Sequence, residues 1–165
     1  MNPLVEQHLT NTYFREYQGL RDQLMQLLTD GDLDYRVGAA TNSLGALCRE
    51  MGDVERAYIE WFRTFRLDFV HHNQDPQVER DVAALTTWYA ELDRDLMAAL
   101  EGLSDDETAN RTIVRSDYDV EDFAPLPTTN LDIYREALLI FYGKVSVYLQ
   151  AMGKPLPRQW QEWIG

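Results

Sequence analysis

Apolar residues recur at steps of three and four positions over four separate stretches of this chain of 165 residues. Residues three or four apart lie on the same face of an α-helix, so each stretch predicts one amphipathic helix. The four predicted apolar faces consist of Val5, Leu9, Tyr13, Tyr17, Leu20, Leu24 and Leu27 in the first helix; Leu44, Leu47, Met51, Tyr58, Phe62 and Phe65 in the second; Val78, Val82, Leu85, Tyr89, Leu92, Leu96 and Ala99 in the third; and Leu131, Tyr134, Leu138, Phe141, Val145, Tyr148 and Met152 in the fourth.

Residues with special backbone preferences predict where these helices begin and end. Glycine accepts the left-handed conformation that follows many helices. Gly31 therefore predicts the end of the first helix, and Gly153, with Pro155 behind it, predicts the end of the fourth. Asp75 followed by Pro76 is typical of an N-cap and a first helical position, and predicts the start of the third helix.

The regular alternation of three and four predicts helices packed nearly parallel or antiparallel. We therefore expect an all-α protein, a four-helix bundle with a single domain over residues 1–165. The connections near residues 31–40 and 71–75 are predicted to be short. The third, over residues 103–127, is long enough to carry local structure and predicts a crossover between helices three and four.

The segments outside the predicted helices carry three further signals. Residues 112–114 favour a short strand, and residues 116–123 are strongly acidic. The C-terminal tail holds Trp160 and Trp163. We expect these two rings to pack against the bundle, and the alternative is an exposed pair at a subunit interface.

Composition excludes some classes of function. The chain has 15 basic and 28 acidic residues, a net charge of −13, so direct binding of nucleic acid is disfavoured. There is no apolar run of membrane-spanning length and no signal-peptide pattern, which predicts a cytoplasmic protein without membrane contact. Cys48, the single cysteine, excludes an intramolecular disulfide.

Two segments have a distinctive sequence: residues 43–58, SLGALCREMGDVERAY, and residues 141–157, FYGKVSVYLQAMGKPLP. The first resembles the second helix of the DinB-like superfamily of metal-binding four-helix bundles, and the second resembles that family's last helix and exit. The resemblance covers nearly the whole chain and implies this fold and a homodimer. In metal-bearing members it implies a zinc or nickel site that serves a thiol transferase, hydrolase or isomerase.

The chain departs from the family pattern at the implied metal ligands. The three histidine positions of the family correspond here to Glu50, Ala137 and Phe141. A glutamate can coordinate zinc, whereas alanine and phenylalanine have no donor atom. We therefore expect no cofactor, with zinc or nickel held by substitute ligands as the alternative.

The residues around these positions suggest a pocket without metal. The helical register places Glu50 near Trp61, at the edge of the buried face. There it is either a remnant ligand or acid/base, or a boundary glutamate paired with Arg49, Arg56 or a residue from another helix. The candidate pocket consists of Glu50, Trp61, Tyr134, Phe141, Tyr142 and Lys144.

Other reactive side chains have plainer interpretations. Cys48 lies on the apolar face and is expected to be a buried thiol without a catalytic partner. His71 and His72 are expected at the end of the second helix, where His72 shares a face with Asp68 only if the helix extends so far. His8 is expected at the core edge or in solvent.

Three hypotheses follow for the function. The first is a non-catalytic bundle that binds a small apolar ligand, a partner protein or a second copy of itself. The second is a metal-dependent thiol transferase or hydrolase with substitute ligands, Glu50 among them. The third, which depends on charge alone, is an acidic decoy of a nucleic-acid-binding protein.

Overall fold

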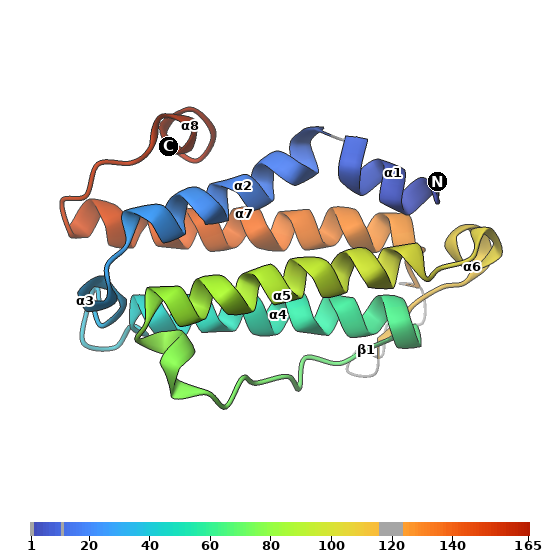
Figure 1. Cartoon of the computed structure of the whole chain (residues 1–165), viewed down its shortest axis with the longest axis horizontal. Helices are drawn as coiled ribbons and strands as arrows, with labels where there is room; N and C mark the ends of the chain where they lie inside the picture. The colour runs from blue at the N-terminus through green and yellow to red at the C-terminus, as the bar shows by residue number, and fades with distance from the viewer. Residues whose placement is uncertain (1, 11, 116–123) are drawn as a thin grey trace.

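The computed structural model describes residues 2–10, 12–115 and 124–165, and its regular structure is almost entirely helical (Figure 1). The expected all-α class is confirmed. The α-helices within these residues are α1 (Pro3–Thr10), α2 (Thr12–Leu27), α3 (Asp30–Leu33), α4 (Leu44–Thr64), α5 (Val82–Glu101), α6 (Asp105–Asn110), α7 (Pro127–Ala151) and α8 (Arg158–Trp163), with a 3-10 helix η1 (Pro76–Glu79) and two short strands, β1 (Arg66–Leu67) and β2 (Val114–Arg115).

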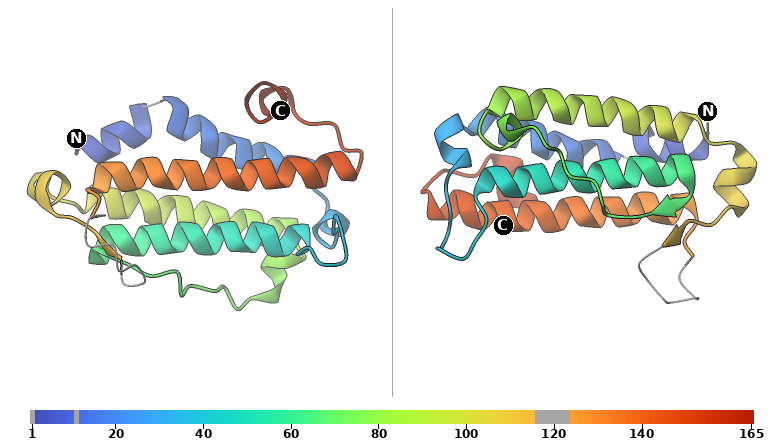
Figure 2. Two further views of the ribbon diagram at one scale, coloured as in Figure 1. Left: turned by 180° about the vertical axis from the view of Figure 1, so that it is seen from behind. Right: turned by 90° about the horizontal axis from the view of Figure 1, so that it is seen from below.

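The four long helices α2, α4, α5 and α7 lie side by side (Figures 1 and 2). Helix α4 packs against both α5 and α7, and α2 contacts the same two helices from the other side. Helices α2 and α7 run in one direction, and α4 and α5 run in the opposite direction. Their inward side chains form one hydrophobic core.

The predicted apolar faces of α4, α5 and α7 form most of this core. Every residue of these faces is buried except Val82 and Met152, which are partly buried against it. The first face is less regular, because α1 and α2 are separate helices and Leu9 is 42% exposed. The side chain of Tyr13 lies outside the described part of the structure.

Two glycines allow α4 to approach its neighbours closely. A Cβ atom at Gly45 would lie 1.9 Å from the carbonyl oxygen of Glu79 in η1. A Cβ atom at Gly52, seven residues later on the same helix face, would lie 2.3 Å from the ring of Trp88 in α5. No real Cβ atom tolerates such distances, so this interface requires glycine at both positions.

The helix ends confirm some of the predicted boundaries. Helix α7 ends at Ala151, and Gly153 has a φ of 69°, as expected for the residue after a helix. The prediction at Gly31 is wrong, since α2 ends at Leu27 and Gly31 lies inside α3. Asp75 caps only the 3-10 helix η1 through the amide of Gln77, while the long helix α5 begins later.

The connection between α4 and α5 was expected to be short, and this prediction is wrong. Helix α4 ends at Thr64, and residues 65–81 run back along its whole length before α5 begins (Figure 1). The return path is held to α4 by Asp53, whose Oδ1 accepts a hydrogen bond of 2.7 Å from the amide of Asn73. Because the chain crosses back here, α4 and α5 run parallel.

The connection between α5 and α7 is long, as predicted, but it begins and ends at the same end of the molecule (Figure 1). It contains α6, and its strand β2 pairs in parallel with β1. The expected strand at residues 112–114 thus lies slightly later in the chain. The acidic residues 116–123 lie outside the described residues.

The C-terminal tail packs on its own chain. Trp160 is fully buried, and its indole nitrogen donates a hydrogen bond of 3.1 Å to the carbonyl oxygen of Leu20 in α2. The ring of Trp163 meets the edge of Tyr17 with centroids 5.5 Å apart. The expected packing against the bundle is confirmed for Trp160, whereas Trp163 contacts Tyr17 and remains 36% exposed.

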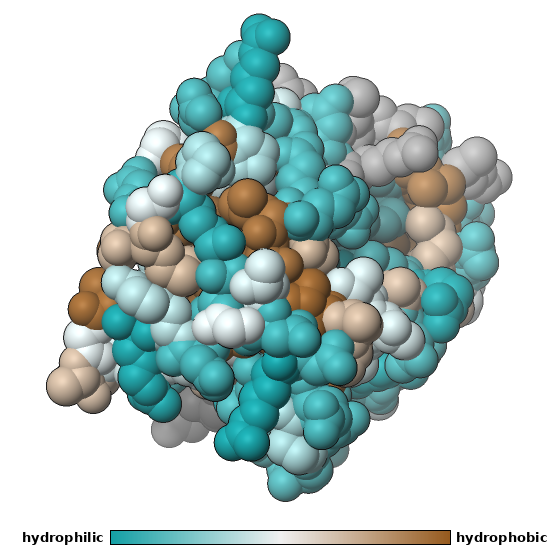
Figure 3. Space-filling model, turned by 60° about the vertical axis from the view of Figure 1, so that its left-hand side comes forward, coloured by the Kyte–Doolittle hydropathy of each residue, from teal (hydrophilic) through white to brown (hydrophobic). Residues whose placement is uncertain are grey.

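The end of the molecule that faces the viewer in Figure 3 is mostly hydrophilic, with apolar residues visible only in small groups between polar ones. This surface agrees with the high fraction of charged residues in the sequence. None of the described helices combines the length and the apolar character that crossing a membrane requires.

Candidate functional site

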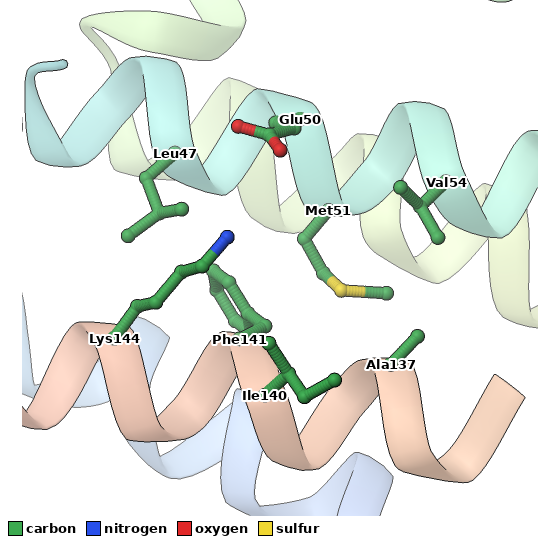
Figure 4. Close-up of a pocket in the computed structure, with 8 residues that line it drawn as sticks. All are labelled: Leu47, Glu50, Met51, Val54, Ala137, Ile140, Phe141 and Lys144. Atoms are coloured by element: carbon green, nitrogen blue, oxygen red, sulfur yellow. The ribbon is translucent and has the colours of Figure 1, made fainter. Parts of the chain in front are cut away.

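A largely apolar pocket lies between the facing sides of α4 and α7 (Figure 4). Its volume is about 160 Å³. Six of its lining side chains are apolar, and the two charged ones stand on different helices; the lining residues are Leu47, Glu50, Met51 and Val54 from α4 and Ala137, Ile140, Phe141 and Lys144 from α7.

The three positions that the resemblance assigns to metal ligands all line this pocket. Their chemistry does not fit a metal ion, because the methyl group of Ala137 and the ring of Phe141 offer no donor atom. Glu50 supplies the only carboxylate of the lining, and Lys144 adds a positive charge. Among the residues that the structure describes, no group of three or more His, Cys, Asp or Glu side chains is placed to hold a metal ion.

The other predicted pocket residues divide into two groups. Lys144 lines the pocket together with Phe141 and Glu50. Trp61, Tyr134 and Tyr142 were predicted there but lie in the core instead, each at most 2% exposed.

Glu50 lies at the pocket, as its interpretation as a remnant ligand or acid/base requires, but its side chain is exposed rather than at a buried edge. Of the arginine partners considered from the sequence, Arg49 binds Asp53 and Glu79, and Arg56 binds Asp95. The carboxylate of Glu50 therefore remains available at the pocket.

Sequence reasoning missed a buried charge cluster in the middle of the bundle. Arg21 of α2, only 1% exposed, forms an ion pair with Glu55 of α4, which is fully buried. Its second nitrogen, Nη2, lies 2.6 Å from Oδ1 of Asp93 in α5. The guanidinium group also lies over the ring of Tyr89, with Cζ 4.2 Å from the centroid, a favourable cation–π arrangement.

The pKa values of Glu55 and Arg21 are both raised, but for different reasons. Burial raises the pKa of Glu55 to about 7, although the charge of Arg21 and the hydroxyl of Tyr134 lower it. Burial also opposes the charge on Arg21, but the neighbouring Glu55 and Asp93 carboxylates raise its pKa well above the usual value. Arg21 therefore stays charged, and its partners compensate it.

Two of the tyrosines around this cluster, Tyr89 and Tyr142, are held by backbone hydrogen bonds. Tyr89 donates a hydrogen bond of 2.6 Å to the carbonyl oxygen of Cys48, and Tyr142 donates to that of Tyr17. Burial raises the pKa values of Tyr89, Tyr134 and Tyr142. These hydroxyl groups are thus protonated structural donors, and none of them lines the apolar pocket.

The sequence contained a signal for the cluster. Glu55 stands four residues after Met51 and three before Tyr58, so it occupies a core position of the second apolar face. Arg21 has the same relation to Tyr17 and Leu24 in the first face. A charge of each sign at a core position predicts a buried pair, because an isolated buried charge is very costly.

A second, more polar hollow of about 310 Å³ adjoins the pocket along α4. The two hollows share Glu50 and Val54. The polar hollow is otherwise lined by Arg49 and Asp53 of α4 and by Phe69, His71 and His72 of the return path.

The histidines lie elsewhere than predicted. Helix α4 ends at Thr64, so Asp68 and His72 do not share a helix face, and His72 instead lies with Nδ1 3.7 Å from Oδ2 of Asp53. His8 is buried rather than at the core edge, and desolvation lowers its pKa to about 4 against the effect of the Asp93 charge.

Cys48 is a fully buried thiol, as expected from its place on the apolar face. Burial raises its pKa to about 12, so the thiolate that a nucleophile needs does not form near neutral pH.

The shifted pKa values of His8 and Glu55 predict opposite pH dependences of stability. His8 has a folded pKa of about 4 against 6.5 in the unfolded chain, so stability falls as the pH drops from 6.5 to 4, by on the order of 3 kcal/mol. Glu55 has a folded pKa of about 7 against 4.5, so its folded form holds the extra proton, and stability falls as the pH rises from 4.5 to 7.

The two effects offset each other between pH 4.5 and 6.5, and single substitutions separate them. In His8→Asn, the free energy of unfolding from urea titrations is expected to decrease steadily from pH 4.5 to 7. In Glu55→Gln it is expected to increase from pH 4 to 6.5. Profiles for both variants that run parallel to that of the parent protein would show that neither group titrates as described.

No protein-family model matches the chain, and no curated protein matches it. The structure thus defines an all-α protein with an apolar pocket between two long helices, and its function must be inferred from the residues of that pocket.

Proposed function

We propose that this chain is a DinB-like four-helix bundle that lacks the family's metal site and acts by binding a small apolar ligand between α4 and α7. The two segments that carry the resemblance lie largely in these two neighbouring helices, over residues 44–58 of α4 and 141–151 of α7. Each segment supplies part of the pocket wall.

The observation that carries this proposal is the pocket at Glu50, Ala137 and Phe141. Three positions that the resemblance assigns, Glu50 on α4 and Ala137 and Phe141 one turn apart on α7, line one hollow whose remaining walls are mostly apolar. Its volume of about 160 Å³ is similar to that of an engineered apolar cavity of about 150 Å³ that binds benzene. A ligand with one small ring or a short branched chain is the size that fits.

Binding, rather than chemistry, is supported by the groups that surround the pocket. Among the residues that the structure describes, the lining includes no thiol, hydroxyl or imidazole, and its acid and base are Glu50 and Lys144. The metal-dependent transferase or hydrolase would need donors that Ala137 and Phe141 do not supply. The decoy hypothesis depends only on the net charge of −13.

The proposed function is tested by titration with ethylbenzene, a neutral probe. Ala137→Phe fills the pocket and is expected to weaken binding at least about tenfold, a loss of about 1.4 kcal/mol. Ala151→Phe is the matched control, because Ala151 is exposed near the end of the same helix and lines no part of the pocket. Absence of binding by the parent, or equal binding by Ala137→Phe, would refute the proposed pocket.

A homodimer is part of the proposal. Ile140 and Val147 are 61% and 51% exposed, and their spacing of seven places them on one face of α7. Two copies could bury this face in a symmetric contact. Sedimentation is expected to show a mass near twice 19.2 kDa, reduced to the monomer by Val147→Glu. A strict monomer in the parent protein would remove the dimer and leave the ligand pocket untouched.

A further inference from the structure

Two opposite charges stand at the apolar pocket on different helices. Figure 4 shows Glu50 on α4 and Lys144 on α7, with the ammonium group of Lys144 directed towards α4. No ion pair or hydrogen bond joins either of them to a described residue, and none joins the two to each other. The pocket thus presents one unpaired charge of each sign.

Other charged residues of these two helices and of the following segment do form ion pairs. Arg49, next to Glu50 in sequence, has its Nε 2.5 Å from Glu79 and also binds Asp53. Lys154, the other lysine of the chain, lies 2.8 Å from Asp32. In a protein with so many acidic residues, a lysine without an acidic partner is unusual, and this one lies at the pocket.

The adjoining polar hollow gives room for the polar part of a ligand. It begins at Glu50 and Val54, where the apolar pocket ends, and has a volume of about 310 Å³. A ligand can therefore place an apolar group against Phe141 and Met51 while its charged groups stay hydrated near Glu50. Charged groups keep most of their hydration in such a position, so the cost of desolvation is small.

We infer that the ligand is a small zwitterion, with an ammonium group and a carboxylate beside one apolar side group, as in a free hydrophobic amino acid. The ammonium group binds Glu50, the carboxylate binds Lys144, and the side group fills the pocket between α4 and α7. This inference rests on the proposed function, because it names the chemical class of the ligand for that pocket.

Four probes with closely related phenyl-bearing skeletons separate the contributions of Glu50 and Lys144 to the binding affinity. L-Phenylalanine carries both, 2-phenylethylamine only the positive one, 3-phenylpropanoate only the negative one, and ethylbenzene neither. Exposed ion pairs contribute little, so each charge is expected to change the dissociation constant by about two- to fivefold. The comparison is made between variants for each probe, which removes differences in probe hydration.

Calorimetric or NMR titrations of the full chain are expected to show a crossed pattern. Glu50→Gln weakens binding of L-phenylalanine and 2-phenylethylamine but not of 3-phenylpropanoate or ethylbenzene. Lys144→Gln weakens binding of L-phenylalanine and 3-phenylpropanoate but not of the other two. Glu136→Gln, an exposed acid of α7 outside the pocket, is the control and is expected to change none of the four.

The inference and the proposed function fail in different ways. The zwitterion is overturned, and the apolar pocket retained, if ethylbenzene binds but L-phenylalanine does not. The same conclusion follows if ethylbenzene binds and each variant changes the affinity for all four probes equally. That result would mean that Glu50 and Lys144 are only solvated charges, or that they pair with each other. Failure of ethylbenzene to bind overturns the pocket itself.

Discussion

Replacing Arg21 by Met is expected to lower the free energy of unfolding by about 3–5 kcal/mol, the usual loss when one partner of a buried ion pair is removed. The substitution leaves Glu55 fully buried without its counter-charge. It also removes the cation that lies over the ring of Tyr89. Urea denaturation at pH 7 would measure the change.

The double variant Arg21→Met with Glu55→Met separates two causes of the lost stability, the uncompensated charge of Glu55 and the loss of packing around Arg21. With both charges gone, no uncompensated charge is left in the core, and most of the lost stability is expected to return. A double variant as unstable as Arg21→Met alone would show that the loss comes from packing rather than from the charge of Glu55.

Installing histidine at Ala137 and Phe141 is expected to create zinc binding that the parent protein lacks. Together with Glu50, the two imidazoles would form a set of two histidines and one carboxylate that zinc accepts. Without zinc, the variant is expected to be less stable, because Phe141 is a buried core residue and a polar ring replaces it. Equilibrium dialysis with zinc, on protein without a histidine tag, would measure the binding.

The matched control carries Glu50→Gln in addition to the two histidines. It keeps the imidazoles and removes the carboxylate, so its zinc affinity is expected to fall well below that of the double variant. One outcome would reverse the interpretation of the site. If the parent protein already binds one zinc per chain, and Glu50→Ala abolishes this, the metal-dependent enzyme becomes the leading hypothesis.

The sequence predicted the helices well where the apolar pattern was continuous. The periodicity of the second, third and fourth faces gave residues that are nearly all buried. The first face was read as one helix but forms α1 and α2. A periodic pattern records which residues share a face, and it does not record a change in helix direction between two segments with compatible spacing.

The path from α4 to α5 could not be predicted from the pattern. Phe65 belongs to the apolar face of the second helix and is buried, yet it has a φ of 56° and already leaves the helix. The residues after it include Leu67, which is also fully buried. Because buried apolar residues continue past the helix end, the pattern alone placed that end too late and made the connection look short.

The pocket was predicted in part. Glu50, Ala137 and Phe141 came from the resemblance, and each of them lines it. Tyr134 and Tyr142 were added because they are close to Phe141 in sequence. Tyr134 also faces α4 but lies in the buried core, with its ring centroid 5.1 Å from that of Tyr58. Tyr142 faces α2 instead and donates to a carbonyl oxygen of that helix.

Methionine methyl NMR during a titration with ethylbenzene tests the ligand pocket most directly. Met51 lines the pocket, whereas Met25, Met97 and Met152 lie in other parts of the core or at its edge. The methyl signal of Met51 is expected to shift with the ring current of the bound probe, while the signals of the other three stay in place. A titration that leaves Met51 unchanged, or that shifts the other three equally, would contradict a ligand-binding pocket between α4 and α7.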